Sequence, residues 1–127
     1  MNRLSIIKLL NDNASAWMMT GSRFICTPPQ TDTDEDYIAL MDEGAEMCLS
    51  THGFAMNTDL ERYQEMPDFL AFRLGEYNVI VTHDDAFYKL FCIATLDAKK
   101  KNLLDKQDRI DLFQKVLYGN DKTQIQF

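Results

Sequence analysis

Residues 20–42 read TGSRFICTPPQTDTDEDYIALMD, and they decide the fold because one apolar segment ends here and a second one begins. Residues 14–20 are short, apolar and stopped by Gly21, a pattern that predicts a buried strand. Residues 37–41 predict a second strand. Between the two segments, four carboxylates fall within residues 32–36, and their mutual repulsion is unfavourable unless a positive group lies beside them.

The length and composition of the chain favour one compact domain. Its 127 residues fit a single domain, which we expect over residues 1–120 with a loose tail over residues 121–127. Hydrophobic residues make up 46% of the chain, which is enough to build a core. The net charge of −7 and the pI of about 4.7 argue against general double-stranded DNA binding, because neutralising phosphates needs clustered lysine and arginine.

The cysteines and the hydropathy pattern indicate a cytoplasmic protein. The three cysteines are widely spaced and form no CxxC or Cys/His metal pattern, so free thiols in a reducing compartment are the simplest interpretation. No apolar run approaches the length of a membrane span, and the N-terminus lacks a signal-peptide core. We therefore expect no membrane contact.

The rest of the chain alternates strand and helix patterns. Residues 69–74 and 77–82 flank Gly75-Glu76, which is a hairpin signal. Residues 57–67 are polar and are expected to be irregular. Apolar spacing predicts helices over residues 4–10 and 106–118. It predicts two more helices whose ends are marked by capping residues. One runs from about Glu43, capped by Asp42, to Gly53, and the other runs from Asp84 or Asp85 to the lysines at 99–101. The sum is an α+β domain with a small mixed β-sheet flanked by helices.

The acidic cluster is a candidate metal site. Alternate residues of a strand share a face, so Asp34 and Asp36 point together and Glu35 points away if the strand begins there. Two carboxylates held in this way suit Mg²⁺ or Mn²⁺, which keeps waters and takes phosphate oxygens as further ligands. The plain alternative for such a cluster is a solvated acidic turn or a helix cap.

The glycine turn upstream is a candidate phosphate site. Gly21 allows the chain to turn sharply and to approach a ligand closely. If a helix or turn begins at Ser22, its N–H groups and hydroxyl can hold phosphates, and Arg23 can add positive charge. Arg73 in the hairpin either faces this site and binds phosphate or lies solvated on the surface.

These segments resemble a known family. Gly21-Ser22, followed by Thr33-Asp34-Glu35-Asp36-Tyr37-Ile38, is similar to the signature of the DNA polymerase β-type nucleotidyltransferase superfamily, and this resemblance covers about residues 14–41. NVIVTHDDAFYKLF (78–91) and DRIDLFQKVLYG (108–119) resemble small nucleotidyltransferase-like proteins of tailed bacteriophages.

The resemblance implies a minimal nucleotidyltransferase fold and Mg²⁺-dependent transfer of an NMP group from an NTP to a protein, RNA or small-molecule acceptor. It implies that Asp34 and Asp36 hold the metal and that Gly21 and Ser22 hold the triphosphate. The family places a third carboxylate on the next core strand, where this chain has Asn78. An amide can ligate through its oxygen but cannot act as a base. Glu76, Asp84 or Asp85 are the candidate substitutes.

Two further classes of function stay open. The first is a degenerate transferase that binds a nucleotide or metal without turnover, as Asn78 suggests. The second is an interaction protein that uses its acidic surface to bind a host protein in the host cytoplasm.

Overall fold

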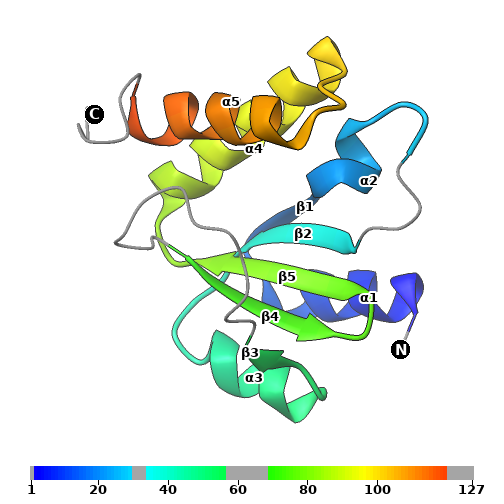
Figure 1. The fold of residues 1–127 in the computed structure, drawn as a ribbon. Coiled ribbons are helices and arrows are strands. Elements are labelled where there is room, and N and C mark those ends of the chain that lie inside the picture. Colours follow the sequence, from blue (N-terminus) through cyan, green and yellow to red (C-terminus); the bar gives the residue numbers. More distant parts are fainter. Residues whose placement is uncertain (1, 30–33, 57–68, 120–127) are drawn as a thin grey trace.

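The structure is a computed structural model that describes residues 2–29, 34–56 and 69–119, and it forms a mixed sheet with helices on both faces (Figure 1). This architecture confirms the predicted α+β class. The segment expected to be irregular (57–67) and the expected tail (121–127) lie outside the described residues.

The sheet combines antiparallel and parallel pairs. Its strand order is β1-β2-β5-β4-β3, with β2 parallel to β5 and the other neighbours antiparallel. The parallel pair aligns the starts of β2 and β5, two segments that lie far apart in the sequence. The elements are α1 (Arg3–Asn13), β1 (Ala16–Thr20), α2 (Gly21–Ile25), β2 (Glu35–Leu40), α3 (Ala45–Thr51), β3 (Ala55–Met56), β4 (Leu70–Leu74), β5 (Tyr77–Thr82), α4 (Asp85–Lys101) and α5 (Lys106–Tyr118).

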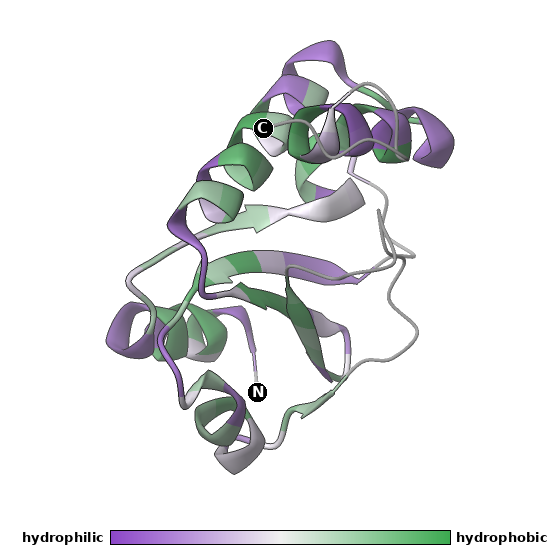
Figure 2. Cartoon of the chain, turned by 90° about the vertical axis from the view of Figure 1, so that its left-hand side faces the viewer, coloured by the Kyte–Doolittle hydropathy of each residue, from purple (hydrophilic) through white to green (hydrophobic). Residues whose placement is uncertain are grey.

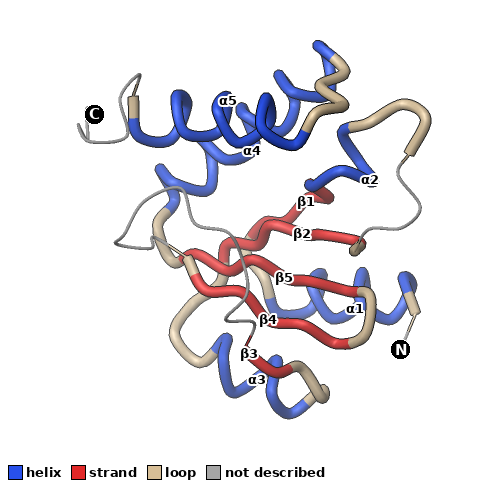
Figure 3. Tube along the Cα trace, viewed as in Figure 1, coloured by secondary structure: helices blue, strands red, loops and turns tan. Residues whose placement is uncertain are grey.

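Each face of the sheet packs against its own set of helices, because strand side chains alternate between the faces. Helices α1 and α3 pack on the face that carries Tyr37 and Val79. Helices α2, α4 and α5 pack on the face that carries Ile38 and Ile80. The two sets lie on opposite sides of the strands (Figure 3), and apolar residues gather in the strands and in the helix turns beside them (Figure 2).

The predicted elements are confirmed, with differences at some of their ends. The hairpin forms around Gly75, and the Asp84 side chain caps α4 by accepting from the Ala86 and Phe87 amides. Strand β2 begins at Glu35, two residues before the predicted start, because its ladder with β5 already begins at the Glu35–Tyr77 pair. An apolar pattern does not reveal a buried acidic residue as part of a strand.

The predicted cap of α3 is wrong. The residue at the N-cap is Gly44, in a left-handed conformation with φ +98°. Asp42 lies further upstream, and its backbone carbonyl accepts from the Ala45 amide over 3.2 Å. The short strand β3, which pairs with β4, was not predicted because two residues carry no periodicity.

Among the described helices, none combines the length and the apolar character that crossing a membrane requires.

Candidate functional site

Polar side chains form a row across the sheet near the start of β2. The pairing register sets Asp36 between Thr20 of β1 and Asn78 of β5. Arg73 of β4 lies opposite Asn78. Directly opposed residues put their side chains on the same face. This is the face of α4, because the hydroxyls of Thr20 and Thr95 hydrogen-bond over 2.8 Å.

Gly21 lies against the Asp36 carboxylate. Its φ is +76°, a conformation that favours glycine, and a Cβ built there would lie 2.0 Å from Asp36 Oδ2. The backbone therefore approaches the carboxylate more closely than any side chain would permit. The start of α2 and Asp36 thus lie side by side, as the sequence predicts.

Asp34 shares the face of Asp36 and touches Arg73. The Arg73 guanidinium donates from Nη2 to Asp34 Oδ2. Asp36 lies close enough for the charges of both residues to act on it, since Asp34 raises its pKa and Arg73 lowers it. The two carboxylates are therefore one electrostatic unit.

Burial dominates the protonation of Asp36. Burial, and to a smaller extent the charge of Asp34, raise the pKa of Asp36 to about 7. A hydrogen bond from Asn78 and the charges of Arg73 and Arg23 act in the opposite direction and lower this pKa. Burial is the largest of these influences, and the neighbouring positive charges and the hydrogen bond offset it only in part.

Glu35 points to the opposite face, as predicted, and is surrounded by donors. Arg3 Nε and the Tyr37 hydroxyl each donate to Glu35 Oε1 over 2.6 Å. Although burial raises the pKa of Glu35, these hydrogen bonds and the charges of Arg3 and Arg23 outweigh it and hold the pKa below its ordinary value. Glu35 is only 3% exposed, so it binds α1 to β2 and leaves no oxygen for a ligand from solvent.

Arg23 and Ser22 lie beside the site in α2. Arg23 Nη1 lies 3.0 Å from Glu76 Oε2 and 3.8 Å from Glu35 Oε2. Arg23 thus connects α2 to the turn between β4 and β5. Ser22 occupies the second position of α2, and its carbonyl accepts from the Cys26 amide over 3.0 Å. Phosphate binding by Ser22 and Arg23 stays a prediction.

The side chains of the row carry oxygen donors of the kind that a hard cation takes. Within residues 2–29, 34–56 and 69–119, no cluster of three or more His, Cys, Asp or Glu side chains is arranged to hold a metal. The side chains of Asp36 and Asn78 nevertheless lie at paired positions on one face, and Asp34 is near enough for its charge to act on Asp36. Oxygen donors of this kind are the ligands that Mg²⁺ and Mn²⁺ take, with waters filling the other positions.

The substitutes proposed for a third carboxylate are engaged elsewhere. Asp84 caps α4, and Asp85 pairs with Lys89 over 2.8 Å. Both follow the far end of β5, whose last residue, Thr82, lies about 13 Å from Asn78 at the usual rise per strand residue. Glu76 is at the correct end of the sheet but pairs with Arg23. Asn78 is therefore the β5 residue that faces Asp36.

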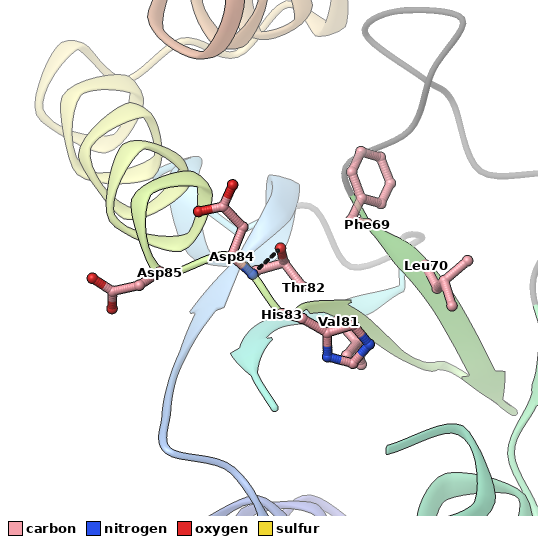
Figure 4. Close-up of a pocket in the computed structure, with 7 residues that line it drawn as sticks. All are labelled: Phe69, Leu70, Val81, Thr82, His83, Asp84 and Asp85. Carbon is pink, nitrogen blue, oxygen red and sulfur yellow. Dashed lines mark hydrogen bonds between the residues drawn. The ribbon is translucent and has the colours of Figure 1, made fainter. Parts of the chain in front are cut away.

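A separate cavity of about 610 Å³ opens at this far end of β5 (Figure 4). Phe69, Leu70 and Val81 form its apolar part, and His83 donates from Nδ1 to the Met41 carbonyl oxygen over 2.5 Å. The Asp85 side chain points away from the other lining residues in Figure 4. The cavity contains none of the residues of the acidic site.

No protein-family model matches this chain, and comparisons with curated proteins and with solved structures found no significant match.

Two features of the site escaped the sequence analysis. The pairing of Glu35 with Arg3 joins residues 32 positions apart, and no local pattern signals it. The contact of Arg73 with Asp34 had a partial signal, because Phe69, Ala71 and Arg73 alternate on one face of the hairpin. That alternation places Arg73 on the face of Asp36 once the strand order is known.

Proposed function

We propose that this protein is a Mg²⁺-dependent nucleotidyltransferase that moves an NMP group from an NTP to a protein, RNA or small-molecule acceptor. One observation carries the proposal: the Asp36 carboxylate lies between the Gly21 turn and Asn78, with Asp34 on the same face. A solvated acidic turn or a helix cap does not require such a close approach of backbone and carboxylate. The resemblance of residues 14–41 to the polymerase β-type signature supports the same function.

Each side chain of the site has a defined task in this proposal. Asp34, Asp36 and Asn78 hold the cation through oxygen, and Gly21 leaves room for phosphate beside them. The metal, when bound, neutralises charge on the phosphate oxygens. Arg73 lies at the outer end of the row and offers a planar guanidinium for the phosphates. Thr20 holds α4 against the row through its bond to Thr95.

Binding without transfer is the second candidate function, and Asn78 favours it. The residue opposite Asp36 is an amide, which accepts no proton from an acceptor hydroxyl and offsets no second cation. In that case the protein binds an NTP with one metal and releases it unchanged. Such a protein could also bind a host protein, either through the bound nucleotide or through its acidic surface.

Incubation with labelled NTPs and Mg²⁺ or Mn²⁺ separates the candidates. We expect transfer of label, or release of pyrophosphate, that falls at least about 100-fold in Asp36→Ala and in Asp34→Ala. The matched control is Asp12→Ala, which removes an exposed carboxylate paired with Lys8 on α1. Circular dichroism verifies that each variant is folded.

The outcomes assign the function. Transfer that depends on Asp34 and Asp36 but not on Asp12 supports the transferase. Metal-dependent NTP binding without pyrophosphate release supports the second candidate. If all four NTPs fail to bind with either metal, both candidates are wrong and an interaction role is left.

A further inference from the structure

Resting on the proposed function, we infer that the Arg73–Asp34 ion pair couples metal binding to phosphate binding in this site. Each member of the pair is also the residue that one ligand needs: Asp34 for the cation and Arg73 for the phosphates. Without ligands the two neutralise one another. Binding of either ligand therefore frees the group that the other ligand uses.

The contact itself shows why the two states exclude one another. Arg73 Nη2 donates to Asp34 Oδ2, so this oxygen already carries a charge-assisted hydrogen bond. A cation that approaches the same carboxylate meets the guanidinium charge at close range. In the same way, phosphates that approach Arg73 meet the carboxylate. The pair must open before either ligand is held fully.

The exposure of the pair makes such opening feasible. The side chain of Arg73 is 47% exposed and that of Asp34 is 33% exposed, so solvent and ligands reach both. Ion pairs of this exposure are worth little individually, and a ligand can replace one partner. Glu35 is the contrast, because its side chain is only 4% exposed in the pair with Arg3 and no ligand from solvent reaches it.

The position of Arg73 keeps it useful after the pair opens. The register places Arg73 opposite Asn78, which is itself opposite Asp36. A released guanidinium therefore stays in the polar row beside the acidic pair. Asp36 lies within reach of the same charges, since Asp34 raises its pKa and Arg73 lowers it.

The first arm of the test measures Mn²⁺ alone. The free Mn²⁺ signal in electron paramagnetic resonance gives the affinity of the full chain without nucleotide. Arg73→Gln is expected to bind Mn²⁺ about three- to tenfold more tightly than the wild type. Arg3→Gln removes an equal charge from the opposite face and is expected to leave the Mn²⁺ affinity within about twofold.

The second arm measures inorganic tripolyphosphate alone, by calorimetry in buffer with a chelator. Asp34→Asn is expected to bind it about three- to tenfold more tightly than the wild type, because Arg73 is free. In the double variant Asp34→Asn, Arg73→Gln that gain is expected to vanish. A gain that persists in the double variant comes from lost repulsion and overturns the coupling.

The results distinguish failure of the coupling from failure of the proposed function. If wild type and Arg73→Gln bind Mn²⁺ equally, the coupling is overturned while the metal site stands. If neither protein binds Mn²⁺ and Asp36→Ala changes nothing, the metal site itself is overturned, and the coupling with it.

Discussion

Glu35 and Asp36 are consecutive in β2 and point to opposite faces of the sheet. Glu35 accepts hydrogen bonds from Arg3 and Tyr37, and its pKa lies below the ordinary value despite its burial. Asp36 has a neutral amide and a glycine turn beside it, and burial raises its pKa to about 7. The first carboxylate is fully compensated by the chain itself. The second is not compensated to the same extent, so the pKa values of these two neighbouring acids shift in opposite directions.

The largest effect on stability is expected for Gly21→Ala, which changes the backbone that contacts Asp36. The new Cβ would lie 2.0 Å from Asp36 Oδ2, and the alanine would have to adopt the backbone φ of +76° that Gly21 has. We expect a loss of at least about 3 kcal/mol in the free energy of unfolding, measured with urea.

Two further variants separate the clash from the strain. Gly44→Ala shares a positive φ of +98° but has open space around its Cβ, so it is expected to cost only about 1 kcal/mol. In an Asp36→Ala background, Gly21→Ala is expected to cost less than in the wild type. An equal cost in both backgrounds would show that the carboxylate does not limit this position.

The next effect is expected for Glu35→Gln, on the other face. This variant leaves Arg3 without its carboxylate and the Tyr37 hydroxyl without a charged acceptor. We expect a loss of about 2 kcal/mol at pH 7, less than for a fully buried pair because Arg3 is 59% exposed. Asp12→Asn, which breaks the exposed pair with Lys8, is the control and is expected to cost under about 0.5 kcal/mol.

A smaller effect, of the opposite sign, is expected for Asp36→Asn. The folded pKa of about 7 lies above the ordinary value of 3.8, so the folded state holds the proton more tightly and stability falls as pH rises between these values. Asp36→Asn should therefore be more stable than the wild type at pH 8, by about 1–2 kcal/mol. The difference should disappear at pH 4. Glu35 acts in the reverse sense, because its lowered pKa contributes stability that is lost as acid protonates it.

The comparison also shows what the sequence can and cannot predict. The period of two in a strand correctly predicts that Glu35 and Asp36 point to opposite faces. Asp34 precedes β2, and its contact with Arg73 is what places it on the side of Asp36. The apolar pattern of residues 77–82 correctly predicts the strand that carries Asn78. The ion pair between Glu35 and Arg3 could not be predicted from the sequence, because it depends on how α1 packs against the sheet. The distant cavity was also beyond reach, since its lining joins the beginning of β4 to the end of β5.

The smallest effect is the most specific to function, and it concerns Mg²⁺ at pH 8. A cation that binds the folded state with a dissociation constant of about 1 mM adds about 1.4 kcal/mol at about 10 mM, which corresponds to about 5 °C in Tm for a chain of this size. Glu35→Gln should keep this shift, because its carboxylate lies on the opposite face and binds no cation. Asp36→Asn should lose it, although that variant is the more stable protein without metal. Because stability and metal response move in opposite directions for Asp36, general loosening of the fold cannot produce this result. A Tm shift that survives in Asp36→Asn would place the cation elsewhere.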